Sequence, residues 1–377
     1  MNILVIKETS LGDVLHATGH LRTIKENFPQ SKLTVLTAQS SSELLQYNPH
    51  VDTLLLFEKD RVKREWFRHL WWCVGHILSL IRLIRTTHFH LAFDLQGGLK
   101  SVIFLYGARA DRKFVKGRWW FLQQFCQPQL HAIEEMSGVL EMAGLHVRKA
   151  DMEIRTSSHE VTVIERLVRR INPDKKKMVL VSPFTRWPTK NWGVENFRSM
   201  LEQLPNDQDM VVLLTGMKRD EGAMDQLLTN LPSSRRVNLA GQLTLLELAE
   251  LMKRVHLVVT GDSFPMHLAS ALHRPVVALF GPTDERLNGP LNSRSVILRS
   301  SRECRRCYQR RRCQWDCLKS LDVGLVLREM NRALDHVVEI KDEIVNEEQG
   351  ERGTSLLKSA RGHGPYRKMG ERKRNVQ

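Results

Sequence analysis

A βαβ unit with a polar turn lies at residues 258–284, and it constrains the fold more than any other part of the sequence. A β-branched strand leads into a Gly-Asp-Ser turn, a short helical segment over Pro265–Leu272 and a second apolar strand over Pro275–Phe280. Strands joined through a helix lie parallel in one sheet. Ligands bind beyond the carboxyl ends of such strands, which is where the turn Gly261–Ser263 falls.

The start of this helical segment has the character of a phosphate-binding site. Pro265 suits the first helical turn because it lacks an N–H that would be unpaired there anyway. We expect the backbone N–H groups from Ser263 to Met266 to face an anion, which the helix dipole also favours. Asp262 and His267 stand beside them. For an isolated turn, the alternative roles are helix capping by Asp262 and simple packing by His267.

The residues around this turn resemble a known signature. The run GDSFPMHLASAL, followed by PVVALFGPTD, is similar to the nucleotide-sugar site of glycosyltransferase family nine, the heptosyltransferases of lipopolysaccharide core assembly. The resemblance implies an inverting enzyme with an α/β fold of the GT-B type, in which two Rossmann-like domains face each other across a cleft. Phe264 departs from the family, which usually has glycine there. The substrate-binding residues implied in this turn are Gly261, Asp262, Ser263, Phe264, Pro265, Met266 and His267.

A second motif lies at the N-terminus. Asn2–Ile6 predicts a strand, KETSLGD at Lys7–Asp13 a glycine-containing turn, and Val14–Asn27 a helix. A single glycine does not make a dinucleotide fingerprint. The family carries Lys-x-x-Ser-Leu-Gly-Asp at this position, which implies that Asp13 is the general base; a helix cap is its alternative role. The substrate-binding neighbours implied are Thr9, Ser10 and Gly12.

Two loops of the second half supply further candidates. After a predicted strand over Met178–Val181, the resemblance implies that Thr185 and Lys190 hold the diphosphate, and Lys190 also stabilises the charge that develops as it leaves. Ser182 and Arg186 are expected to share this work. After a predicted strand over Met210–Leu214, an acidic residue is expected to contact the nucleoside: Glu221, with Asp220 as the alternative.

The same residues predict transfer without a cofactor, with ADP-heptose as donor substrate. Asp262 alone is a poor Mg²⁺ site, and its carboxylate is expected to orient the turn amides or a sugar hydroxyl. Metal binding elsewhere is left open by four clustered thiols with C-x2-C-x5-C-x3-C spacing, interleaved with five arginines. We expect a compact loop near the acceptor site there. These thiols are Cys304, Cys307, Cys313 and Cys317.

Strand and helix patterns alternate in both halves of the 377 residues and predict two domains. We expect an acceptor-binding Rossmann-like domain over residues 1–155 and a hinge over 156–177. A nucleotide-sugar-binding domain follows over 178–338. The tail, 339–377, is expected to be disordered, since eight basic residues from Arg352 on oppose the single acid Glu371.

The chain is strongly basic, with 57 Lys and Arg against 42 Asp and Glu and a formal net charge of +15. This balance suits nucleic acid, an anionic membrane or a phosphorylated substrate. Residues 61–86 interleave basic and aromatic side chains before an apolar stretch too short to span a bilayer, which predicts an interfacial helix. Residues 112–121 (RKFVKGRWWF) form a second such cluster. Core packing is the alternative role for both.

Residues 1–6 lack the pattern of a signal peptide. We therefore expect a cytoplasmic enzyme, peripheral on the inner face of the inner membrane, whose partners are the nucleotide-sugar donor, a lipopolysaccharide acceptor (Kdo-lipid A or heptosylated core) and the anionic membrane surface, without nucleic acid. Two alternatives stay open. One is a family member with a different nucleotide sugar. The other is a non-catalytic nucleic-acid-binding protein on this fold, although the sequence has no recognisable RNA-binding motif.

Overall fold

The structure is a computed structural model of the whole chain. It describes residues 1–119, 122–204, 210–231, 235–300, 306–311 and 317–335. Met1–Ala333 form one compact unit. The predicted tail, Trp120, Phe121, Cys304 and Cys313 lie outside the described residues.

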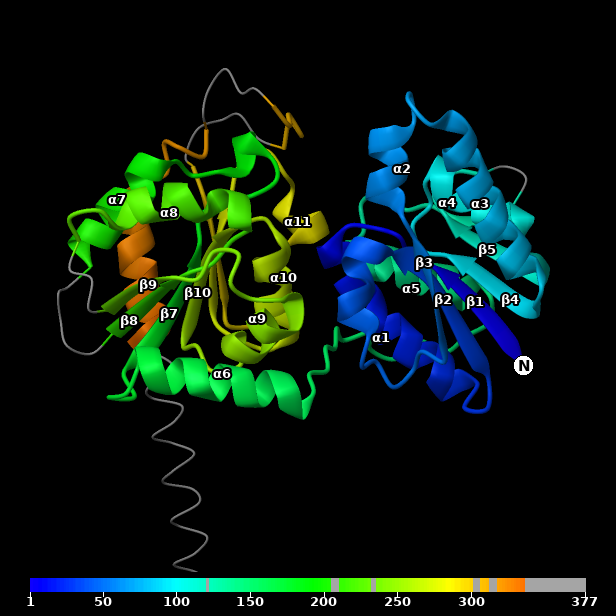
Figure 1. The fold of residues 1–377 in the computed structure, drawn as a ribbon, viewed down its shortest axis with the longest axis horizontal. Coiled ribbons are helices and arrows are strands. Elements are labelled where there is room, and N and C mark those ends of the chain that lie inside the picture. Colours follow the sequence, from blue (N-terminus) through cyan, green and yellow to red (C-terminus); the bar gives the residue numbers. More distant parts are fainter. Residues whose placement is uncertain (120–121, 205–209, 232–234, 301–305, 312–316, 336–377) are drawn as a thin grey trace, which may run out of the picture. The chain divides into compact units, whose positions relative to one another are not determined.

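Two six-stranded sheets form the fold, and every pairing between the described strands is parallel (Figure 1). The first sheet has the order β3-β2-β1-β4-β5-β6, and its strands are β1 (Asn2–Ile6), β2 (Lys32–Ala38), β3 (Thr53–Phe57), β4 (His88–Asp94), β5 (Arg109–Lys116) and β6 (Gln123–Phe125). The second has the order β12-β11-β10-β7-β8-β9, and its strands are β7 (Lys177–Ser182), β8 (Met210–Leu214), β9 (Arg236–Asn238), β10 (Leu257–Gly261), β11 (Val276–Phe280) and β12 (Ser295–Arg299). The predicted two-domain α/β fold is confirmed.

Both sheets have the same topology when each is followed from its own first strand. In each sheet the first strand is central, the next two strands in the chain extend the sheet on one side of it, and the last three extend it on the other side, as in a Rossmann fold. The reversal falls between β1 and β4 in the first sheet and between β7 and β10 in the second. Side chains that follow these four strands therefore lie at the two switch points, where ligands bind in open parallel sheets.

Helices connect the strands, and several begin with a side-chain cap. Ser157 and Thr244 each accept a backbone N–H while a glutamate three residues later bonds back, which fixes the starts of two helices. The helical segments are α1 (Leu11–Asn27), η1 (Gln39–Leu45), α2 (Lys59–Glu65), α3 (Leu70–Arg85), α4 (Leu99–Gly107), α5 (Ala132–Met142), α6 (Ser158–Ile171), η2 (Pro188–Lys190), α7 (Val194–Gln203), η3 (Lys218–Asp220), α8 (Glu221–Leu228), α9 (Leu245–Met252), α10 (Phe264–Ala271) and α11 (Glu285–Asn288). A further helix covers residues 323–335.

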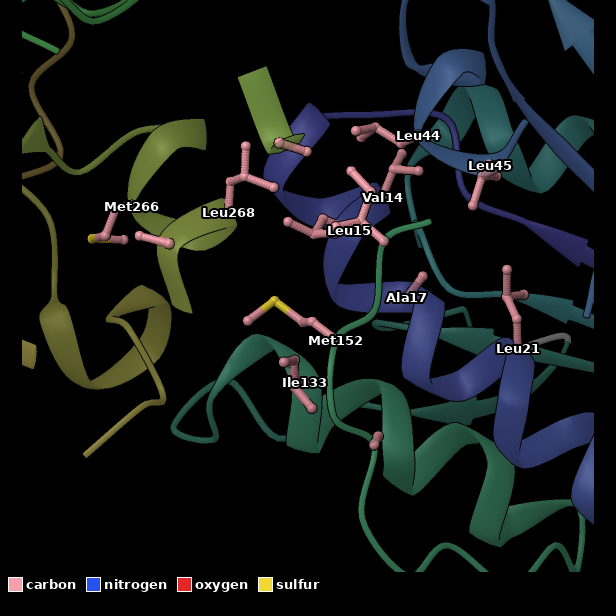
Figure 2. Packing of buried hydrophobic residues seen from close by; sticks show 14 of the residues in the cluster. Val14, Leu15, Ala17, Leu21, Leu44, Leu45, Ile133, Met152, Met266 and Leu268 are labelled. Atoms are coloured by element: carbon pink, nitrogen blue, oxygen red, sulfur yellow. The ribbon is translucent and has the colours of Figure 1, made fainter. Parts of the chain in front are cut away.

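One apolar cluster joins residues of the first sheet's helices to residues of the second's. It includes Val14 and Leu15 of α1 together with Met266 and Leu268 of α10 (Figure 2). All four side chains are at most 1% exposed, and each fully buried aliphatic side chain contributes about 1.5–3 kcal/mol. Helix α10 thus packs against α1 at the end of α1 that carries Asp13.

The structure corrects several predictions from sequence. Helix α1 begins at Leu11, so Gly12 and Asp13 lie in its first turn and not in a loop. Residues 61–86 form two helices, α2 and α3, instead of one. Strands β5, β6 and β9 were not predicted: β5 carries mainly charged residues and includes the start of the 112–121 cluster, and the other two have three residues each.

Candidate active site

A compact polar cluster lies at the switch point of the second sheet. Lys190, from the loop after β7, places its Nζ 2.6 Å from Oδ2 of Asp262, which directly follows β10. Thr283, from the loop after β11, donates its hydroxyl to the same oxygen at 2.6 Å. Asp262 is buried, so pairing and hydrogen bonding offset the cost of taking its charge out of water. The cluster brings an ammonium group to the carboxyl ends of three strands.

The carboxylate of Asp262 was expected to orient the turn amides or a sugar hydroxyl. Its Oδ2 instead bonds to Lys190 and Thr283 from the facing loops, and contact with a sugar hydroxyl stays a prediction. Thr283 was not predicted as a site residue, although it lies in the quoted GPTD run. Sequence reasoning missed it because Gly-Pro-Thr-Asp is also an ordinary turn sequence.

The loop after β7 folds on itself around Thr185. Its backbone N–H donates to Oδ1 of Asn191 at 2.8 Å, and its hydroxyl donates to the Trp187 carbonyl at 2.8 Å. The hydroxyl predicted to hold a diphosphate therefore already has a partner. Ser182 is buried at the end of β7, and Arg186 is exposed.

Gly261 allows this loop to approach β10 closely. A Cβ atom at Gly261 would lie 2.9 Å from the Lys190 carbonyl oxygen and 3.1 Å from Cγ2 of Thr185. A larger residue would push both away. The glycine in the Gly-Asp-Ser turn is thus explained by packing of the strand against the Lys190 loop.

The predicted amide cradle at the start of α10 is only partly present. Pro265 lies in the first turn, as expected, and the N-cap is Ser263 and not Asp262. However, the Met266 N–H donates to the Ser263 carbonyl at 3.0 Å, and proline has no N–H. The prediction that amides from Ser263 to Met266 are free is therefore wrong for these two positions. Phe264 begins the helix with helical backbone, so glycine is not needed there.

Asp13 caps the helix on which it lies. Oδ2 accepts the backbone N–H of Ser10 at 2.6 Å and the Ser10 hydroxyl at 2.9 Å. Burial raises the pKa of Asp13, but the Lys7 ammonium and the bonds from Ser10 outweigh it and hold that pKa well below its usual value. Asp13 is therefore a carboxylate at neutral pH. Capping and a catalytic role are compatible, since both bonds end on one of its two oxygens.

The switch point of the first sheet holds a second group of buried charges. Lys7 and Glu8 follow β1, and Asp94 ends β4; all three are at most 3% exposed. Lys7 donates to the Leu95 carbonyl at 3.2 Å, and Glu8 pairs with Lys59 at 3.2 Å. Glu8 and Asp94 were not predicted as site residues, because one acidic residue at the end of a strand is a weak signal. Thr9 lies at the same place: its N–H donates to Gln96 at 3.1 Å, and its hydroxyl accepts from Lys59.

Burial dominates the titration of this group. It raises the pKa of Asp94 to about 6, although the N–H groups of Gln96 and Gly97 bond to its Oδ1. It also raises the pKa of Glu8 and lowers that of Lys7.

Two histidines join helix α1 to helix α10. Nε2 of His16 lies 2.9 Å from Nδ1 of His267, and the rings meet edge to face with centroids 4.4 Å apart. Burial, together with the neighbouring His267 ring, holds the pKa of His16 well below its usual value, and burial also lowers the pKa of His267, so both rings are neutral. A Cβ at Gly12 would lie 2.5 Å from Cδ2 of His267. The two sequence motifs thus meet directly, through Gly12 and His267.

The remaining predicted site residues are Glu221, its alternative Asp220 and the four clustered thiols. Glu221 starts α8 and pairs with exposed Lys218 at 2.7 Å, while Asp220 accepts the Met217 N–H at 2.9 Å. Among the described residues, these bonds stay within the loop after β8 and do not reach the Lys190 cluster. Of the four clustered thiols, the structure describes Cys307, which is exposed, and Cys317, which is buried. Among the described residues no group of three or more metal-ligating side chains converges.

Comparison with known proteins identifies the family. The model of glycosyltransferase family 9 (heptosyltransferase) matches residues 77–318. A lipooligosaccharide heptosyltransferase 2 from Haemophilus influenzae is 36% identical over 316 residues, covering 79% of this chain and 88% of that protein. A lipopolysaccharide core heptosyltransferase, OpsX, of the same species is 21% identical, covering 78% and 82%.

Solved structures share the fold. The ADP-heptose heptosyltransferase II of Escherichia coli superposes with a TM-score of 0.70 at 22% identity, covering 89% of this chain and 99% of that one. Heptosyltransferase WaaC of the same species, solved with ADP, gives 0.66 at 18% identity, covering 88% and 100%. The family model covers well over half of the chain and includes the Lys190 cluster and the turn at Asp262. The protein is therefore a glycosyltransferase and belongs to glycosyltransferase family 9, the heptosyltransferases.

Proposed function

We propose that this enzyme transfers L-glycero-D-manno-heptose from ADP-heptose to the inner core of lipopolysaccharide, with inversion at the anomeric carbon. The 36% identical relative is named a lipooligosaccharide heptosyltransferase, and it is covered over 88% of its length. The observation in this chain that carries the proposal is the Lys190–Asp262–Thr283 cluster at a Rossmann switch point.

Lys190 is proposed to bind the diphosphate of the donor. An ammonium group has three N–H donors, so it can keep Asp262 and still bond to phosphate oxygens. Its positive charge opposes the negative charge that develops on the departing ADP. The backbone N–H groups of Ser263 and Phe264 and the dipole of α10 are proposed to assist Lys190 in binding the diphosphate. Thr185 and Ser182 are proposed to complete the donor site from the loop after β7.

Asp13 is proposed to act as the general base. The acceptor hydroxyl attacks the anomeric carbon, the bond from that carbon to the diphosphate oxygen breaks, and the hydroxyl proton passes to Asp13. A carboxylate with a low pKa is a weak base, but a hydroxyl that is bonding to an oxocarbenium-like carbon becomes strongly acidic. Proton transfer is therefore late in the step. Thr9, Ser10 and Gly12 are proposed to hold the acceptor beside Asp13.

The two sheets are proposed to divide the substrates between them. Residues 1–155 would bind the acceptor and residues 178–338 the nucleotide sugar, with residues 156–177 as the hinge. Glu221 is proposed to contact the nucleoside and Arg186 to assist with the diphosphate. The Ser158–Ile171 helix occupies most of the hinge and packs against α9, so bending would occur at its ends.

The enzyme is proposed to work in the cytoplasm on the inner face of the inner membrane. Phe67 is 96% exposed and Trp71 87% exposed, and they follow the basic last turn of α2, which carries Lys63 and Arg64. On α3, Cys73, Leu80 and Ile84 face the core, while Trp71 lies outside. Aromatic rings at headgroup depth with cations toward lipid phosphates are typical of interfacial helices. No described helix has the length and apolar character needed to cross a bilayer.

A donor screen tests the reaction. Purified enzyme is incubated with ADP-heptose and other nucleotide sugars, using Kdo-lipid A acceptors with and without one heptose, and products are identified by mass spectrometry. Heptose transfer supports the proposal. Transfer of another sugar in preference to heptose would instead support the second candidate, a family member with a different donor. Vesicle binding tests the proposed membrane contact. The double variant Phe67→Ala with Trp71→Ala should reduce sedimentation of the protein with anionic vesicles. Unchanged sedimentation would contradict a membrane contact through Phe67 and Trp71.

A further inference from the structure

The arginine-rich segment 306–311 is attached to the loops that carry the Lys190 cluster. Tyr308 donates its N–H to the Pro282 carbonyl at 2.9 Å, and its hydroxyl accepts the Asp284 N–H at 3.3 Å. On the other side, Thr189 donates its hydroxyl to the Gln309 carbonyl at 2.5 Å. Pro282 and Thr189 are direct chain neighbours of Thr283 and Lys190. The segment therefore lies against the donor-site loops after β7 and β11.

Two arginines of this segment have different surroundings. Arg306 pairs with Asp284 at 3.0 Å and with Glu285 at 2.7 Å, so its charge is neutralised by the protein. Arg310 is exposed, and its guanidinium lies over the ring of Trp187 with 4.6 Å to the centroid. Within the described residues, no carboxylate forms an ion pair with Arg310. Arg306 thus anchors the segment, while Arg310 presents a charge without an acidic partner.

Trp187 brings Arg310 close to Lys190. The Nζ of Lys190 lies 4.4 Å from the centroid of the same indole ring, on which Arg310 also stacks. Stacking on the indole ring restricts the orientation of the Arg310 guanidinium and is weakly favourable at an exposed site.

We infer that Arg310, stacked on Trp187 beside Lys190, is a binding residue for a phosphate ester. A guanidinium presents a planar fork of N–H donors that matches phosphate oxygens in pairs, and stacking on an aromatic face leaves the edge that bears these donors open. The phosphate ester comes either from the nucleotide donor or from a phosphorylated acceptor. The inference rests on the proposed function for the choice of these two ligands.

Nucleotide binding tests the donor as source. The dissociation constants of ADP and of adenosine are measured by calorimetry on the full chain. Arg310→Ala should weaken ADP binding roughly tenfold, the lower part of the range for a charge-assisted contact because the site is exposed and salt screens it. Adenosine, which has no phosphate, should bind equally to both proteins. Arg310→Lys should lie between wild type and Arg310→Ala, because it keeps the charge and loses the fork.

Kinetics test the acceptor as source. If Arg310 serves an acceptor phosphate, Arg310→Ala should leave ADP binding unchanged and raise the acceptor KM roughly tenfold, and phosphatase treatment of the acceptor should abolish the difference between the two proteins. Arg294→Ala is the matched control. Arg294 is also exposed and has no carboxylate partner among the described residues, but it directly precedes β12, at the amino ends of the parallel strands, whereas the Lys190 cluster lies at their carboxyl ends. Its removal should change neither constant.

The outcomes separate this inference from the proposed function. Wild-type protein that binds neither ADP nor ADP-heptose would overturn the proposed donor itself. Wild-type protein that binds ADP, with Arg310→Ala equal to it in both the nucleotide and the acceptor measurements, would overturn the role of Arg310 alone. An equal loss in Arg294→Ala would also overturn it, because the effect would then come from net charge.

Discussion

The two switch points have the same topology, but their buried charges are compensated in different ways. At β7 and β10, Lys190 and Asp262 meet at 2.6 Å and Thr283 completes the bonding of the carboxylate. In the first sheet, Lys7 follows β1 and Asp94 ends the neighbouring strand β4, but Lys7 bonds to a backbone carbonyl and Asp94 to backbone N–H groups. The first pair is neutralised within the protein. The second pair stays separate, and burial raises the pKa of Asp94 to about 6 and lowers that of Lys7.

This difference indicates how one fold supports two tasks. The ion pair with Asp262 holds the Lys190 ammonium in a fixed place, which suits the diphosphate binding proposed for it. An unpaired buried group costs free energy, and such costs are typical of sites that handle protons or await a ligand. The Lys7 charge also lowers the pKa of Asp13, which connects the first switch point to the proposed base.

Removal of the Asp13 carboxylate should have the largest effect. Asp13→Asn should lower kcat by about 10² to 10⁴, the usual contribution of a general base, and leave the donor dissociation constant unchanged. Asparagine keeps an oxygen that can accept the bonds from Ser10, so the start of α1 should stay intact. Steady-state kinetics and thermal unfolding measure both. If kcat is nearly normal, Asp13 is only a cap; if unfolding shifts as much as activity, the loss is structural.

Asp94→Asn should stabilise the protein at alkaline pH. The pKa of Asp94 is about 6 in the folded chain and 3.8 in its unperturbed state, so the folded chain holds the proton more tightly. Between about pH 4 and 6 this group's contribution to stability falls as pH rises, and it is constant above. Removing the charge should therefore raise the free energy of unfolding by up to about 3 kcal/mol at pH 8.

The gain from Asp94→Asn should shrink as the pH falls toward 4 and disappear below that pH, where Asp94 is protonated in both the folded and the unfolded chain. Asparagine still accepts from Gln96 and Gly97, so the turn after β4 should be kept. Urea unfolding at pH 5, 6.5 and 8 measures the trend. A loss of stability at pH 8 would show that the charge is compensated, by Lys7 or another neighbour, and the contrast between the two switch points would fail.

Loss of Lys190 tests the paired switch point. Lys190→Ala should raise the donor KM and lower kcat, with a combined cost of roughly 1.5–3 kcal/mol in kcat/KM, the worth of a charge-assisted hydrogen bond. It also leaves Asp262 without its cation, so Lys190→Ala with Asp262→Asn serves as the control. The double variant should recover folding stability and not donor affinity. Unchanged donor kinetics in Lys190→Ala would move attention to Arg186.

Disturbing the contact between Gly12 and His267 should have a smaller effect on activity than loss of Lys190. Gly12→Ala places a Cβ 2.5 Å from the His267 ring, so the ring must shift and the 2.9 Å bond between His16 and His267 must lengthen. Overpacking of this kind costs about 1–3 kcal/mol. We expect lower kcat/KM with a retained fold. The double variant Gly12→Ala with His267→Ala, which removes the clash, should show no further loss; a fully additive loss would indicate that the contact is unimportant.

Local elements of the fold could be predicted from the sequence, whereas contacts between distant residues could not. Most strands of both sheets and the inward faces of α1 could be predicted, because apolar β-branched runs and helical spacing are local signals. The meeting of Gly12 with His267 could not, since it depends on residues about 250 positions apart. The ion pair of Lys190 with Asp262 was missed for the same reason, and it changed the role assigned to Asp262. Strand β5 was missed because its charges hide a partly buried strand.

Removal of divalent metal should have the smallest effect, namely none. Metal-dependent sites usually present several carboxylate oxygens to a hard cation, which bridges them to the diphosphate. Here Oδ2 of Asp262 bonds to the Lys190 ammonium and the Thr283 hydroxyl. A metal ion at this oxygen would have to displace the Lys190 ammonium, which already neutralises the carboxylate. Transfer should therefore continue in EDTA at constant ionic strength. Asp262→Asn should weaken use of the donor by loosening Lys190, and it should create no need for metal. Loss of activity in EDTA with recovery on addition of Mg²⁺ would contradict a lysine-based donor site; recovery only with Zn²⁺ or iron would point instead to a structural metal at the clustered thiols that include Cys307 and Cys317.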